Sequence, residues 1–297
     1  MRRNAFTTFH PIVNFVYFTF VLVFSMAFMH PLFQAISLAG AIGYSILLNG
    51  RKAVKFNLLY MLPLLLVMAA FNPIFNHAGV TILFYLPNGN PFTRESILYG
   101  IAAACMYVTV IVWFSCFNKV ITSDKLMYLF GKIMPAISLI LAMTLRFVPR
   151  YRHQLSVISQ AQRSIGRDLS QGNLIERARN GLRILSILTT WAMENAIETA
   201  DSMKARGYGL PKRTSFSIYR FERRDQLTLS IMIGLVAIVL TGAALEENTI
   251  RYFPSVVMKE YSLFSFVVYG AYFIFCTLPV MFQIVEEVKW KYIVSKI

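Results

Sequence analysis

Long apolar runs alternate with short polar and basic segments along most of this chain. A helix needs about 20 predominantly apolar residues to cross the hydrocarbon core of a bilayer. Six segments approach or reach this length, and they cover residues 12–29, 32–48, 57–75, 97–117, 227–245 and 262–282. The pattern therefore predicts an all-α integral membrane protein with about six transmembrane helices.

The positive charges indicate how these spans are oriented, because Lys and Arg accumulate in the cytoplasmic loops of membrane proteins. With a cytoplasmic N-terminus, the basic residues on the same side are Arg2, Arg3, Arg51, Lys52, Lys55, Lys289, Lys291 and Lys296. The outer connections, 76–96 and 246–261, then carry no net positive charge. We expect a multi-pass protein of the cell membrane with both termini in the cytoplasm. The first span is longer than the apolar core of a signal peptide, so we expect it to be retained.

A basic segment, residues 118–226, separates the first four predicted spans from the last two. It contains 18 Lys and Arg against 8 Asp and Glu, a net charge of +10 out of +15 for the whole chain. Only 14% of the chain is charged, whereas soluble domains average about 25%. Because membrane spans flank the segment, we expect lipid and protein partners rather than nucleic acid. The chain thus divides into N-terminal membrane helices (1–117), a cytoplasmic or interfacial helical region (118–226), and C-terminal membrane helices with a cytoplasmic tail (227–297).

Two long helices are predicted inside the basic segment. The first begins at Pro135 and is apolar over its first half. It is expected to break or kink near residues 145–148, because Pro149 removes a backbone hydrogen bond and clashes with the preceding turn. The second extends from about Asn173 to Arg206, with apolar residues at three- and four-residue steps. Both helices are therefore expected to have an apolar face.

Each of these helices ends in a turn that contains arginine and glycine, and the two turns are about 40 residues apart. Gly166 lies in the first turn, and Gly207 follows Arg206 in the second. The planar guanidinium of an arginine at a helix end can enter an acidic groove on a partner protein. The alternative is an arginine that reaches the membrane interface beside an ordinary glycine stop.

The residue types that carry catalytic or metal chemistry form no recognisable pattern here. The 3 cysteines show no CxxC spacing, the 4 histidines form no HExxH pattern, and no GxxxxGK[ST] phosphate loop is present. Glu194 and Glu198 lie one helical turn apart, which a solvated or partner-facing helix surface explains best. We therefore expect no catalytic residues, no metal ligands and no cofactor.

Two further classes of function are alternatives. A self-contained membrane permease would need internal repeats or polar sites inside the membrane, but the predicted spans contain no Asp or Glu. Pro63 and the Asn72–Pro73 pair interrupt the third span, either as a kink that neighbouring helices accommodate or as a broken helix at a substrate site. An integral membrane enzyme would need a nucleophile–base pair or a metal cluster, and the sequence suggests neither.

Four motifs follow one another in the basic segment. They are an LxxxFGKIMP-like stretch (Leu126–Pro135), LRFVP (Leu145–Pro149), AQRSIG (Ala161–Gly166) and MKARGYG (Met203–Gly209). In this order, and after about four N-terminal spans, they resemble the transmembrane T component of energy-coupling factor (ECF) transporters, the EcfT/CbiQ family. The resemblance covers nearly the whole chain and is most specific over residues 126–209.

This resemblance implies a membrane scaffold that neither hydrolyses ATP nor binds substrate by itself. Two cytosolic ABC-type ATPase subunits would dock on the ends of the two long coupling helices, each through an Ala-Arg-Gly or Ala-Arg-Ser-like motif. One small membrane S component would capture a vitamin or a transition metal such as cobalt or nickel. The T component would convert closure of the ATPases into toppling of the S component, in which substrate selectivity would reside.

The second docking motif of the family is intact in this chain as Ala205, Arg206 and Gly207. The resemblance therefore makes Arg206 the main expected ATPase contact. We also expect the apolar face of the second coupling helix to contact the S component, and its residues are Ile184, Leu188 and Trp191.

The first docking motif departs from the family pattern, which usually reads AQx[AS]RG. Ile165 stands where the arginine is usual, between Ser164 and Gly166. Either Arg163 or Arg167, which flank this turn, replaces the missing arginine, or the contact with this ATPase is more apolar.

Overall fold

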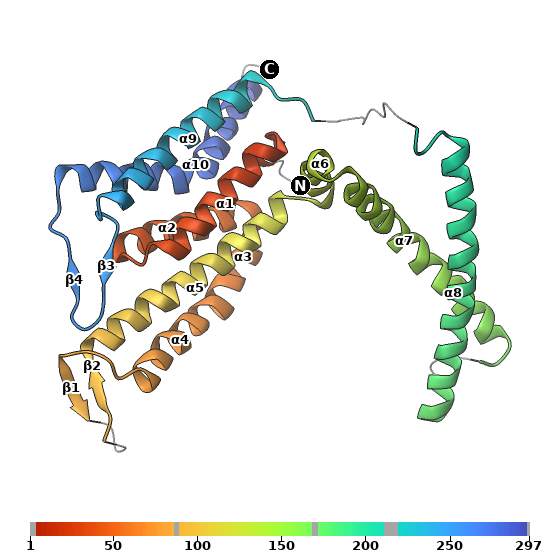
Figure 1. Cartoon of the computed structure of the whole chain (residues 1–297), viewed down its shortest axis with the longest axis horizontal. Helices are drawn as coiled ribbons and strands as arrows, with labels where there is room; N and C mark the ends of the chain where they lie inside the picture. The colour runs from red at the N-terminus through yellow and green to blue at the C-terminus, as the bar shows by residue number, and fades with distance from the viewer. Residues whose placement is uncertain (1–3, 86–88, 168–171, 211–218, 296–297) are drawn as a thin grey trace. The chain divides into compact units, whose positions relative to one another are not determined.

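The computed structural model describes residues 4–85, 89–167, 172–210 and 219–295, which are predominantly helical (Figure 1). The helices are α1 (Pro11–Ala27), α2 (Pro31–Asn49), α3 (Arg51–Phe56), α4 (Leu62–Phe75), α5 (Arg94–Val120), α6 (Ser123–Ile133), α7 (Pro135–Ser164), α8 (Leu174–Ala205), α9 (Arg223–Ala244) and α10 (Leu263–Val294). Two small antiparallel pairs, β1–β2 and β3–β4, precede α5 and α10, and their strands are Ile82–Tyr85, Pro91–Thr93, Ile250–Arg251 and Val257–Met258. The predicted all-α fold class is confirmed.

These elements form two compact units. The first contains residues 1–126 and 219–297, and the second contains residues 127–218. The helices that are long and apolar enough to span a membrane all belong to the first unit, whereas α7 and α8 belong to the second. Residues 211–218 of the basic segment lie outside the described residues.

The first unit contains one fewer full-length span than the sequence suggests. Among the described residues, five helices are long and apolar enough to cross a membrane: α2, the rod Arg51–Phe75, α5, α9 and α10. The segment predicted at 12–29 is helix α1, which has only 17 residues. At 1.5 Å per residue it is about 26 Å long, which is less than the hydrocarbon thickness of about 30 Å. Its short length results from Pro11 at its first turn and an extended residue, Phe28, at its end.

The prolines of the third predicted span do not break it. A π-helical segment, Asn57–Met61, joins α3 to α4, and α4 continues through Pro73 to Phe75. The Asn72 side chain accepts a hydrogen bond from Ser96 Oγ at 3.1 Å, and α5 approaches α4 closely at Gly100, where a Cβ atom would lie 2.8 Å from the Ala69 carbonyl oxygen. Packing against α5 therefore accommodates Pro73, and the structure favours this interpretation over a broken helix.

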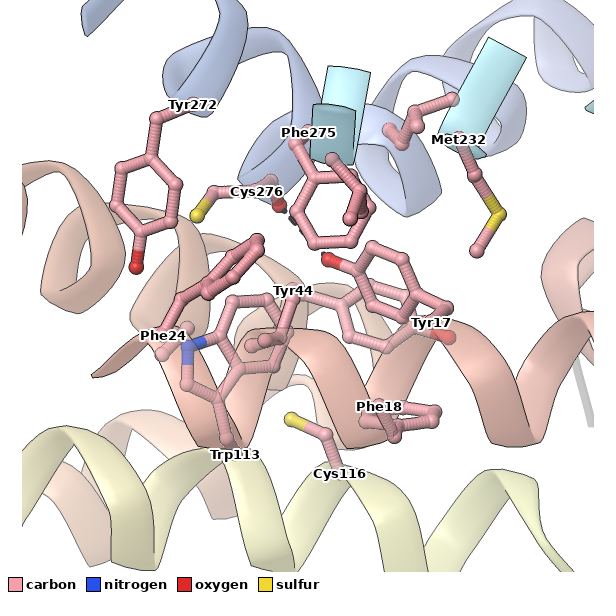
Figure 2. Packing of buried hydrophobic residues seen from close by; sticks show 14 of the residues in the cluster. Tyr17, Phe18, Phe24, Tyr44, Trp113, Cys116, Met232, Tyr272, Phe275 and Cys276 are labelled. Carbon is pink, nitrogen blue, oxygen red and sulfur yellow. Dashed lines mark hydrogen bonds between the residues drawn. The ribbon is translucent and has the colours of Figure 1, made fainter. Parts of the chain in front are cut away.

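An aromatic cluster forms the core of the first unit (Figure 2). Trp113 of α5 is fully buried, and its indole Nε1 donates to Ser37 Oγ of α2 at 3.0 Å. The Tyr17 ring from α1 lies edge-on to Trp113 with centroids 6.0 Å apart, and Phe275 of α10 packs on Tyr17 at 5.2 Å. Helices from both ends of the chain thus meet in one aromatic cluster. The cysteines of this cluster, Cys116 and Cys276, are buried and free.

Buried polar contacts fasten the N-terminal segment to the start of α9. The backbone N–H of His10 donates to Asp225 Oδ1 at 3.0 Å, and the other carboxylate oxygen of Asp225 accepts from the Glu222 N–H at 3.1 Å. Lys125 Nζ, from α6, donates to the Thr7 carbonyl at 2.7 Å. Burial lowers the pKa of Lys125 to about 8. Hydrogen bonds therefore hold the first unit in place close to both of its connections with the second unit.

Candidate functional site

The second unit is built on an antiparallel pair of long helices, α7 and α8. The Tyr151 ring of α7 packs edge-on against Trp191 of α8, with centroids 5.6 Å apart. About two helical turns from this contact, the aliphatic side chains of Ile158 in α7 and Ile184 in α8 are buried. Of the break or kink predicted near residues 145–148, the break is wrong, because α7 is helical through Pro149 to Ser164; the kink stays a prediction.

The two candidate docking motifs occupy the C-terminal ends of these helices and share one backbone geometry. After α8, Gly207 N–H donates to the Lys204 carbonyl at 2.9 Å and Tyr208 N–H donates to the Met203 carbonyl at 3.0 Å. This pair of bonds is the Schellman motif, in which the glycine has a left-handed conformation. The φ angle of Gly207 is +80°, so a residue with a Cβ atom would be strained there. Arg206 is therefore held as the last residue before the turn, and it is exposed.

The first motif repeats this arrangement at the end of α7. Gly166 N–H donates to the Arg163 carbonyl at 3.0 Å, Arg167 N–H donates to the Gln162 carbonyl at 2.9 Å, and Gly166 has a φ angle of +78°. In this register Ile165 takes the position of Arg206, with backbone angles of −100° and 18° against −84° and 8°. Ile165 is 60% exposed. The first motif thus presents an aliphatic side chain at the position where the second presents a guanidinium.

The two motifs lie at opposite ends of the helix pair. Because α7 and α8 are antiparallel, Arg163, which is 12 residues beyond Tyr151, and Arg206, which is 15 residues beyond Trp191, lie in opposite directions from the Tyr151–Trp191 contact. At 1.5 Å per residue, about 40 Å of helix separates the two ends. Two separate partner molecules can therefore contact the two motifs at the same time.

A cleft of about 910 Å³ lies beside the second motif, between α7 and α8. Arg146 and Arg150 of α7 line it together with Arg206, and Glu198 of α8 lines it as well. The Arg150 guanidinium lies over the Trp191 ring, 5.6 Å from its centroid. Sequence reasoning missed this cleft, because it depends on which turns of the two helices lie side by side.

The residues expected to face an S component lie on the face of α8 that packs against α7. Ile184 is only 2% exposed, Leu188 is half-buried, and Trp191 contacts Tyr151. A second apolar stripe of α8 is exposed instead, and it lines a shallow groove formed by Leu182, Leu185, Ser186, Thr189, Thr190 and Met193. The apolar periodicity of α8 contains both stripes. The sequence therefore shows that each is apolar, but it does not show which one packs against α7 and which one is exposed.

Comparison with known proteins places this chain in a family. The family model described as CbiQ, cobalt transport protein, matches residues 6–216, which is more than half of the chain. The chain belongs to the CbiQ family. The resemblance noted in the sequence is thereby confirmed, and as a CbiQ family member the chain is a multi-pass membrane protein.

Curated relatives carry the name energy-coupling factor transporter transmembrane protein EcfT. The protein from Lactobacillus helveticus is 36% identical over 105 residues, which cover 35% of this chain and 38% of the relative. EcfT 1 from Listeria monocytogenes is 31% identical over 173 residues, 54% of this chain and 64% of the relative. EcfT from Acidaminococcus fermentans is 34% identical over 158 residues, 50% of this chain and 59% of the relative. The matched regions span less than two thirds of these relatives.

Proposed function

We propose that this chain is the transmembrane scaffold and coupling subunit of an ECF-type importer for a vitamin or a transition metal. The observation that carries the proposal is the pair of exposed, geometrically equivalent helix ends, separated by about 40 Å of helix. Each end would engage one of two cytosolic ABC-type ATPase subunits, which would supply the ATP hydrolysis. The names of the EcfT relatives support an ECF transporter as the assembly.

The helix pair suits this role mechanically. A continuous helix of 30 residues, α7, packs along one of 32 residues, α8, so movement of one end is transmitted along the pair rather than absorbed at a break. Arg206 would insert its fork of N–H donors into an acidic groove of an ATPase. Gly207, with its left-handed backbone, ends the helix directly after this arginine. The N- and C-termini and the helix pair would lie on the cytoplasmic side of the membrane, with the first half of α7 at the membrane interface.

The proposal is tested by co-expressing this chain with its genomically adjacent ATPase and S-component candidates and purifying the assembly through a tag on this chain. A complex that contains two ATPase subunits and one S component, and that hydrolyses ATP whereas this chain alone does not, is the expected result. Selective binding of a vitamin or metal ion by the lone chain, without partner capture, would instead indicate a self-contained permease.

The first motif yields a prediction about its substituted arginine position. Ile165→Arg is expected to leave folding and complex yield unchanged, because Ile165 is exposed and already has the backbone geometry of Arg206. Arg163→Ala is expected to reduce ATPase activity of the complex more than Ile165→Ala does. The measurement is ATP hydrolysis by purified complexes. Full activity in both Arg163→Ala and Arg167→Ala would show that neither arginine contacts the ATPase.

We further propose that the S component contacts the exposed stripe of α8 rather than the stripe that faces α7. Single cysteines at Leu185 and Met193 are expected to crosslink to a cysteine-bearing S component, because both residues are largely exposed in the shallow groove. A cysteine at Ile184 is the matched control and is expected to give little product, since that residue is buried. A higher crosslinking yield from Ile184 than from Leu185 and Met193 would mean that the S component contacts the face predicted from the sequence.

A further inference from the structure

The cleft between α7 and α8 changes character along its length. Leu139 and Met143 provide an apolar wall from the first half of α7, and Arg146 and Arg150 follow them on the same helix. From Leu139 to Arg150 the helix rises about 16 Å. An occupant of the whole cleft must therefore have an apolar part and, beside it, a part that interacts with arginine.

The charged end of the cleft has an excess of positive charge. Three arginines line it against one acidic residue, Glu198, and no ion pair joins Glu198 to an arginine within the described residues. The Arg150 guanidinium is positioned by its contact with the Trp191 ring, which restricts its side chain before any ligand arrives. The cleft is therefore electrostatically suited to an anion.

A buried amide adds a polar group to the same wall. Asn195 lines the cleft and is only 7% exposed. Its Oδ1 accepts the Thr199 hydroxyl at 3.4 Å, so its NH₂ group can donate to an occupant. A buried donor of this kind stabilises an oxygen-rich ligand, because an unsatisfied buried amide costs free energy.

The surroundings of the apolar end indicate hydrocarbon rather than water. Ile137 and Ile140, in the same half of α7, are each more than half exposed. In a multi-pass membrane protein, exposed aliphatic side chains that are followed along a helix by arginines are expected to lie at the hydrocarbon boundary, with the arginines at the level of the headgroups. Along α7 the apolar wall of the cleft comes first and the arginines follow, which is the order expected across that boundary.

We propose that this cleft binds one anionic phospholipid. Its phosphate accepts bidentate hydrogen bonds from Arg146 and Arg150, and an acyl chain lies along Leu139, Met143 and Phe147. The apolar wall favours a lipid over an acidic protein segment. The uncompensated positive charge favours an anionic lipid over a zwitterionic one, since the cationic group of the latter would add to the arginines.

Native mass spectrometry of the purified, delipidated full chain tests this proposal. We expect one phosphatidylglycerol molecule to bind about tenfold more tightly than phosphatidylcholine with the same acyl chains, the difference being attributable to charge. Glycerophosphoglycerol, the headgroup without acyl chains, is expected to bind at least tenfold more weakly than the lipid. Equal affinity for the two lipids would overturn the proposal, and tight binding of the headgroup alone would identify a free phosphate ester as the ligand.

Paired variants locate the site. Arg146→Gln with Arg150→Gln is expected to reduce phosphatidylglycerol affinity to the phosphatidylcholine level. The matched control, Arg152→Gln with Arg183→Gln, changes two exposed arginines of the same helices outside the cleft and should bind as the wild type does. Unchanged binding in the cleft variant would place the lipid elsewhere. Arg146→Lys with Arg150→Lys preserves the charge and is expected to retain the lipid preference, which separates loss of binding from misfolding. Because these measurements use the chain alone, their outcome is independent of ATPase docking.

Discussion

Replacing Arg206 by glutamate is expected to abolish co-purification of the ATPase that we propose to dock at the end of α8. The residue is exposed, and the Schellman turn that follows fixes it as the C-cap residue of α8. Losing one partner of a buried, hydrogen-bonded charge pair costs about 2–5 kcal/mol, and a reversed charge adds repulsion from an acidic groove. The dissociation constant should therefore rise by about 30-fold or more. Pull-down of the ATPase through a tag on this chain measures the effect.

The matched control is Arg183→Glu, the same charge reversal at an exposed position in the middle of α8. It should leave the yield of complex unchanged, whereas Arg206→Glu should eliminate one ATPase without altering membrane insertion of the chain. Equal recovery of the ATPase by both variants would mean that the end of α8 is not a docking site. Loss in both would indicate dependence on the overall charge of the helix.

The largest effect on stability is expected from Trp113→Ala. This substitution removes the fully buried indole against which Tyr17 of α1 and Tyr44 of α2 pack, and it leaves Ser37 without its indole donor. Truncation of a buried tryptophan typically costs about 3–5 kcal/mol. In a membrane the packing contribution remains, because lipid does not fill the resulting cavity. The loss of unfolding free energy is measured by unfolding the protein in mixed micelles with increasing sodium dodecyl sulfate. Far-ultraviolet circular dichroism follows the transition, because this signal does not depend on the tryptophan that is removed.

The neighbouring residue supplies the control for this experiment. Phe114 follows Trp113 on α5 but is 51% exposed, so Phe114→Ala should cost far less, about 1 kcal/mol or below. Similar losses in the two variants would mean that Trp113 does not organise the core. A much larger loss for Phe114→Ala would indicate that its exposed face is covered by another protein.

The positions of the long helices could be predicted from the sequence because their end signals are local. Asn173 caps α8 with its side chain and Glu176 completes a capping box, as expected for a helix that starts near Asn173. Of the break or kink expected before Pro149, the break did not form. A proline removes only one hydrogen bond from a helix, and packing of α7 against α8 can offset that cost.

The candidate site could be predicted only in part. The sequence contains its motifs and its apolar periodicity, but it does not contain the register in which α7 and α8 pack. Ile165 was identified from the family motif as the residue that replaces an arginine, and the equivalent turns agree with this alignment. The apolar stripes of α8 could not be assigned to their neighbours. Periodicity shows that Ile184 and Leu185 lie on different faces, but only the antiparallel register determines which of them α7 covers.

The matching turns carry unlike residues at the C-cap position, and this has a consequence for how an assembly would disassemble. A contact centred on Arg206 is ionic and weakens as salt screens it, whereas at the first motif Ile165 adds apolar burial, which sulfate and similar salts strengthen, to the ionic contribution of Arg163. Rising ionic strength should then detach the nucleotide-hydrolysing subunits one after the other, starting from the arginine end. The two contacts that hold the importer together would differ in chemistry. A complex that has lost one of its two ATPase subunits would then form as an intermediate between the intact and the fully dissociated states.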